Sequence, residues 1–106
     1  MKVQSIKKFQ QGDVIIKTST LKQGKKLNHL CLQKSDVSNH SHQITRGDAI
    51  LYSTQDKEKQ ILVVKSKEAH LTHEEHKPII IPKGKYLVYN VKEYDPFEEE
   101  IRRVRD

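Results

Sequence analysis

The chain has 106 residues, which is near the commonest size of a single domain. Because 34% of the residues are hydrophobic and 32% are charged, the core must be modest and the surface heavily solvated. The formal net charge of +6 permits an anionic partner. With no Trp, four Tyr and two Phe, however, the chain has few aromatic rings on which nucleic-acid bases can stack.

The polar N-terminal segment, residues 1–11, has Val3, Ile6 and Phe9 spaced three apart, which is compatible with one or two helical turns or with an arm. Apolar runs of strand length then follow, separated by Gly-Asp, Lys-rich and Pro-Gly turn signals. They cover residues 14–16, 27–32, 49–52, 60–65, 79–81 and 86–91, and residues 82–84 are predicted to form the turn between the last two. This spacing predicts an all-β fold, a small single-domain barrel or sandwich.

The C-terminal segment changes from a strand pattern to a helical one. Asp95 is a suitable N-cap and Pro96 suits the first helical position, while Phe97, Ile101 and Val104 fall on one face. We therefore expect residues 1–106 to form one β domain, with a short capped helix at residues 95–105 packed on it.

Cysteine content and hydropathy indicate the cellular setting. Cys31 is the single cysteine, so no internal disulfide can form, as is usual in a reducing compartment. No segment resembles a signal peptide or approaches the roughly 20 apolar residues that span a bilayer. These features predict a soluble, cytoplasmic protein with no membrane partner.

Two pairs of histidines carry the strongest chemical signal in the sequence. His40 and His42 are two residues apart, so on a strand they point to the same side. His73 and His76 are three apart, adjacent on a helical turn or able to converge from a tight loop. Neutral imidazole is a common ligand of zinc, iron, nickel and copper, so the pairs predict a shared site for a divalent transition metal.

The residues between the second pair extend this hypothesis. Glu74 and Glu75 are expected to act as oxygen ligands, as partners that fix a histidine tautomer, or as a general base. The spacing of HEEH differs from the HExxH motif of metalloproteases, whose histidines are four apart. Two alternatives stay open, namely a hydrogen-bonded cluster without a metal and unrelated surface histidines. His29, in an apolar run, is expected to be a core residue, whereas His70 either extends the HxxH spacing backwards or is solvated.

The HxH pair, the later Pro-x-Gly turn and the strand-rich pattern resemble the cupin superfamily. That resemblance implies a small β-barrel that binds a divalent metal through histidines. The wider pattern, from QGDV through THEEHKP to EYDPFEEEIRRV, also looks like a family of small uncharacterised bacterial proteins. This second resemblance implies no function.

These observations lead to one principal functional hypothesis, a protein that binds a metal or a small-molecule ligand at the four histidines. The sequence identifies no reaction, so it does not say whether the protein is an enzyme. The alternative is a basic, non-enzymatic binding module for a protein partner or for nucleic acid, in which case nucleic-acid binding would be weak and non-specific. Association into a homo-oligomer stays open.

Overall fold

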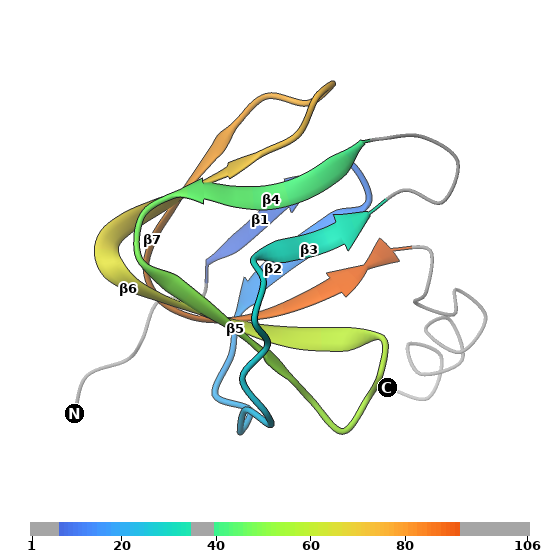
Figure 1. The fold of residues 1–106 in the computed structure, drawn as a ribbon, viewed down its shortest axis with the longest axis vertical. Coiled ribbons are helices and arrows are strands. Elements are labelled where there is room, and N and C mark those ends of the chain that lie inside the picture. The colour runs from blue at the N-terminus through green and yellow to red at the C-terminus, as the bar shows by residue number, and fades with distance from the viewer. Residues whose placement is uncertain (1–6, 35–39, 92–106) are drawn as a thin grey trace, which may run out of the picture.

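The computed structural model of the chain describes residues 7–34 and 40–91. In this part of the chain, seven strands form one antiparallel sheet (Figure 1). They are β1 (Lys8–Gln11), β2 (Val14–Thr18), β3 (Cys31–Lys34), β4 (Ser41–Arg46), β5 (Ala49–Ser53), β6 (Lys59–Thr72) and β7 (Ile79–Asn90). The hydrogen-bonded order is β1-β2-β7-β6-β4-β3, and β5 also pairs with β6.

The predicted all-β fold class is confirmed, and the sheet is compatible with the barrel or sandwich that was expected. Strands β1 and β3 lie at the two ends of the hydrogen-bonded order, so the sheet does not close into a complete barrel.

The sheet is organised around the long hairpin of β6 and β7, which bend together (Figure 1). The pairing register shifts between Val64 and Glu68 on β6, opposite Gly84 and Pro82 on β7. Between these pairs β6 has three residues (65–67) and β7 has one (83), and extra residues in one strand bend it and increase its twist. The two sides of this bend have different neighbours, because β5 pairs with the first half of β6 and β4 with the second half.

This hairpin corrects the sequence prediction for residues 82–84. They do not form a turn between two strands but lie inside the continuous strand β7. Proline and glycine are found in strands at bulges and sharp bends, where a regular ladder of hydrogen bonds is interrupted anyway. The turn signal therefore marked a change of strand direction and not the end of a strand.

Two further boundaries differ from the prediction. Residues 8–11 form a strand and not a helical turn, because they pair with residues 14–17 of β2 across the Gly12-Asp13 turn. The strand predicted at residues 27–32 begins later, at Cys31, and is preceded by an isolated bridge between Lys26 and Tyr52. The helix predicted at residues 95–105 lies outside the described residues.

The core lies between the two halves of the bent sheet and contains residues that alternate along the central strands. Leu62 and Val64 on β6 are buried, as are Tyr86 and Val88 on β7, which matches the two-residue period of a strand. The cluster is completed by Val14, Ile16, Leu32, Ile44, Leu51, Ala69, Leu71 and Ile81. Each large side chain buried here contributes about 1.5–3 kcal/mol.

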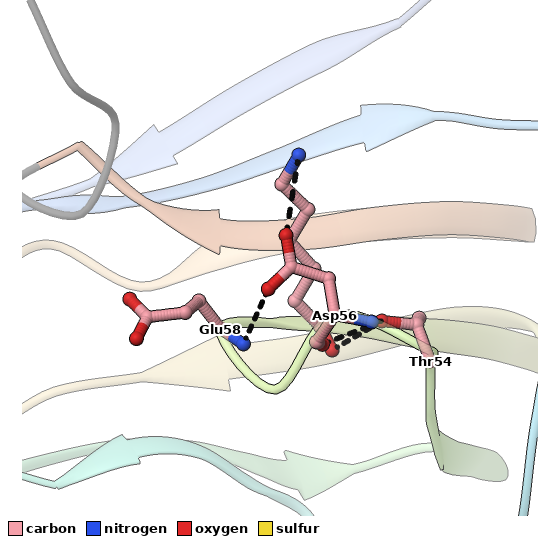
Figure 2. A network of polar contacts seen from close by, with 4 residues as sticks. Thr54, Asp56 and Glu58 are labelled. Carbon is pink, nitrogen blue, oxygen red and sulfur yellow. Dashed lines mark hydrogen bonds and ion pairs between the residues drawn. The ribbon is translucent and has the colours of Figure 1, made fainter.

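The turn between β5 and β6 is closed by side chains (Figure 2). The Thr54 hydroxyl donates to the backbone carbonyl of Asp56 (2.7 Å) and accepts the Asp56 amide (3.1 Å). The carboxylate of Asp56 accepts the backbone amide of Glu58 at 2.9 Å and forms an ion pair with Lys59 at 3.8 Å. These contacts all lie within the turn and its first flanking residue, and they stabilise the turn locally.

Within the described residues, no helix has the length and apolar character needed to cross a membrane.

Candidate functional site

The two predicted histidine pairs come from segments that are distant in the sequence but adjacent in the fold. His42 lies in β4 and His40 immediately precedes it, whereas His73 and His76 belong to the loop between β6 and β7. The pairing of β4 with the end of β6 brings these two segments together, since Gln43 lies opposite Thr72. The turn between β1 and β2 approaches from a third side, at Gly12.

The four imidazole rings lie against one another. Ring centroids are 4.2 Å apart for His42 and His73, and 4.6 Å apart for His73 and His76. The remaining contacts are 5.4 Å between His40 and His73 and 5.9 Å between His42 and His76. We refer to these four residues as the four-histidine group.

Gln11, at the end of β1, fixes both the loop and one of the rings. Its side-chain nitrogen donates to the carbonyl oxygens of Leu71 at 3.1 Å and Lys77 at 2.9 Å, which lie on either side of the histidine loop. Its side-chain oxygen is 2.8 Å from Nδ1 of His42. Because an amide oxygen can only accept a hydrogen bond, Nδ1 of His42 must carry the proton, and Nε2 keeps a free lone pair in the neutral ring.

His42 is held in this neutral form. It is 7% exposed, and burial lowers its pKa from 6.5 to about 4, with further contributions from the adjacent His73 and His76 rings. Asp13 and Glu74 act in the opposite direction but do not compensate. At neutral pH the buried ring is therefore uncharged, which is the protonation state that a metal ligand or a general base requires.

The two glutamates contact different partners. The carboxylate of Glu74 accepts the backbone amide of Ser41 at 2.9 Å, and this hydrogen bond is the main reason that the pKa of Glu74 is lowered. The carboxylate of Glu75 is 3.3 Å from Nδ1 of His40. Glu74 thus joins the loop to the start of β4, and Glu75 contacts one of the four rings.

His73 has the opposite tautomer to His42. Its Nδ1 accepts the backbone amide of Glu75 at 3.0 Å, so the proton of the neutral ring must be on Nε2. In this arrangement neither nitrogen of His73 offers a free lone pair. Consistent with this, no three His, Cys, Asp or Glu side chains within residues 7–34 and 40–91 are placed to hold a metal ion.

The other two described histidines lie apart from the group. The core role expected for His29 is wrong, because its side chain is exposed and its Nδ1 accepts the backbone amide of Cys31 at 3.3 Å. His70 is half-buried on β6, with its Nε2 4.0 Å from the carboxylate of Glu68.

Two residues of the site were missed at the sequence level. Gln11 is 2% exposed and contacts His42, yet a glutamine beside a turn carries no pattern that predicts burial. Gly12 has a positive φ of 57°, and a Cβ there would lie 2.7 Å from Nε2 of His76 and 3.3 Å from Cε1 of His42. The Gly-Asp signal predicted the turn, but only the fold shows that the turn packs against imidazole rings.

The fold and these side chains define a small, open antiparallel β-sheet protein in which a buried glutamine orients one of four adjoining imidazoles. The chain belongs to a family of domains of unknown function, DUF8820, whose model matches residues 10–90. The matched span includes Gln11, Gly12 and all four histidines. The match is to this family and not to the cupins, so the cupin resemblance is not supported, whereas membership of an uncharacterised family agrees with the second resemblance. Comparisons with curated proteins and with solved structures gave no match.

Proposed function

We propose that the protein binds a divalent transition metal at the four-histidine group. The observation that carries the proposal is the hydrogen bond between Gln11 and His42, which fixes a neutral ring with its Nε2 lone pair free. Histidine ligands of metals commonly donate their other ring nitrogen to a fixed oxygen in this way, and the partner sets both the tautomer and the ring orientation.

The spacing of the rings supports the same proposal. With Zn–N distances of about 2.0–2.1 Å and tetrahedral angles, two imidazoles on one zinc ion have centroids roughly 5 Å apart. The four ring contacts in the four-histidine group have centroid distances of 4.2 to 5.9 Å. The metal would be zinc, iron, nickel or copper, all of which accept imidazole nitrogen.

Metal binding requires side-chain rotation at the loop. His76 is exposed, and His40 and His73 are half-buried, so these rings have room to change rotamer while His42 stays in place. Nδ1 of His73 accepts the Glu75 amide, so the proton of the neutral ring is on Nε2 and neither nitrogen can bind a metal. His73 must therefore give up this hydrogen bond before it can become a ligand. Glu74 or Glu75 is then available as an oxygen ligand or as a hydrogen-bond partner for a ligating ring.

We propose a binding function and no reaction. Three nitrogen ligands with an open position would leave room for a small-molecule ligand on the metal, whereas four would close the site. The lone Cys31 supports a cytoplasmic location for this protein.

The test uses the 106-residue chain purified without an affinity tag. The chain is titrated with Zn²⁺, Ni²⁺, Cu²⁺ and Fe²⁺ at pH 7.5, and binding is measured by calorimetry and by element analysis. We expect a stoichiometry of one ion per chain. A metal at a hundredfold excess over its Kd stabilises the native state by about 2.7 kcal/mol, so the melting temperature should rise and a chelator should reverse the rise.

The controls separate this site from scattered histidines. His42→Ala and His76→Ala should each abolish the metal-dependent shift, and the double variant should lose no more than either alone, because both residues serve one site. His29→Ala removes an exposed histidine outside the group and should leave the shift intact. Absence of both stoichiometric metal and a melting shift would overturn the proposal and favour a hydrogen-bonded, metal-free group.

A further inference from the structure

A hollow in the surface lies at the other end of the β1–β2 hairpin from the histidines. It has a volume of about 610 Å³ and is lined by Lys7, Thr18, Ser19, Thr20, Lys83, Gly84, Lys85 and Tyr86. Strands rise by about 3.3 Å per residue, so Lys7 at this end is roughly 13 Å along the chain from Gln11 at the histidine end. The two sites are therefore separate.

Charge is the first property of this cavity. Three lysines line it, and no Asp or Glu is among its described lining residues. None of the three ammonium groups forms an ion pair with a carboxylate in the described part of the chain. Among the described residues, the cavity thus concentrates positive charge with no carboxylate paired to it, and such a concentration of charge raises the local concentration of anions.

The bend in β7 explains why the lysines gather here. Lys83 and Lys85 are two residues apart on either side of Gly84, at the point where β7 changes direction. A Cβ at Gly84 would lie 3.2 Å from the hydroxyl of Tyr86, so glycine lets the backbone pass close to that ring. The Tyr86 hydroxyl is itself held by the carbonyl of Pro82 at 2.7 Å, which fixes the ring under the bend.

Hydroxyl groups provide the neutral donors of the cavity. The Ser19 oxygen accepts the backbone amide of Leu21 at 3.0 Å, which leaves its own O–H free to donate. The backbone amide of Ser19 donates to the carbonyl of Lys85 at 3.1 Å and ties this wall to β7. Lysine ammonium groups together with hydroxyl donors are a usual combination for binding phosphate oxygens.

We propose that this cavity binds the phosphate groups of a small phosphorylated molecule. Its volume falls within the range of about 300–1,000 Å³ that small-molecule sites occupy. A hollow lined by three lysines favours a compact ligand with several negative charges over an extended strand, for which the chain also has few aromatic rings on which bases can stack. This inference is independent of the metal proposal, because the sites share no residue.

The experiment is a titration of the ¹⁵N-labelled 106-residue chain with inorganic tripolyphosphate in about 150 mM NaCl, monitored by NMR. Saturable shifts should appear at residues 18–20 and 83–85, with a Kd below about 1 mM. The Lys83→Ala/Lys85→Ala variant should bind roughly tenfold more weakly, because it loses two charge-assisted contacts. The amide spectrum of each variant reports directly that it is folded.

A charge-matched control and a second probe decide the outcome. The Lys34→Ala/Lys57→Ala variant loses the same charge at residues that do not line the cavity, and it should bind as the wild type does. Equal weakening in both variants, or no saturable shift, would show diffuse attraction only and overturn the proposal. The second probe is a single-stranded 20-mer oligonucleotide. If it binds more tightly than tripolyphosphate, and the Lys83→Ala/Lys85→Ala variant loses that binding, the proposal is overturned in favour of nucleic acid.

Discussion

Replacement of Gln11 by alanine tests the arrangement on which the candidate site depends. The substitution removes three hydrogen bonds, one to the His42 ring and two to the carbonyls of Leu71 and Lys77. Each intramolecular hydrogen bond contributes about 0.5–1.5 kcal/mol, and a partner left buried without a bond costs about 1–3 kcal/mol. Gln11 is 2% exposed, so water does not easily replace the lost contacts. We therefore expect Gln11→Ala to lower the free energy of unfolding by about 2–4 kcal/mol.

The measurement is equilibrium unfolding in urea at pH 7.5. The matched control is Gln10→Ala, since Gln10 is the adjacent residue, is exposed, and donates one hydrogen bond to the carbonyl of Gly12. This control should cost no more than about 0.5 kcal/mol, as is usual for surface substitutions. The ¹⁵N chemical shifts of the His42 ring should also report Nδ1–H in the wild type. Equal stabilities of the two variants, or an Nε2–H ring at His42, would refute the assignment of Gln11 as the residue that orients His42.

Two further predictions concern the same end of the molecule. The pKa of His42 is about 4 in the native state and 6.5 in the unfolded chain, so the unfolded state binds the additional proton between these values. The contribution of His42 to the free energy of unfolding should be complete above pH 6.5 and fall by up to about 1.4 kcal/mol per pH unit down to pH 4. A His42→Gln variant whose stability varies equally steeply with pH would show that this pH dependence does not come from His42. Gly12→Ala should destabilise the protein by about 1–2 kcal/mol because of the positive φ at residue 12, while Gly12→Asn should cost less, since asparagine tolerates this conformation. Thermal unfolding of both Gly12 variants checks the order, and the reverse order would show that the contact with His76 outweighs the backbone strain.

The fold class was predictable from the sequence because the core strands have strong local patterns. The predicted strands at residues 14–16, 49–52 and 60–65 lie within β2, β5 and β6. Strand β1 was not predictable, since its residues KFQQ have little apolar alternation. It is stabilised by its pairing with β2 and by the burial of Gln11, and these are tertiary effects.

The candidate site divides in a similar way. The spacing of the histidine pairs marked the four residues, but it carried no information on which ring would be buried or which nitrogen would be protonated. Those properties depend on Gln11, which is 31 residues away from His42 in the sequence. The different tautomer of His73 depends on a backbone amide in its own loop, two residues away, and the loop conformation decides that contact.

The pairing of β2 with β7 has a consequence for the synthesis of this protein. Val14 pairs with Asn90, so an early strand has its partner near the other end of the described chain. At a translation rate of about 5–20 residues per second, β2 waits several seconds before β7 exists. Strand β7 can pair first with β6, which directly precedes it, and the β1–β2 hairpin then docks against that edge. If the strands pair in this order, Gln11 and Gly12 arrive with the hairpin, and the histidine loop of the nascent chain stays exposed until one of the last steps of folding.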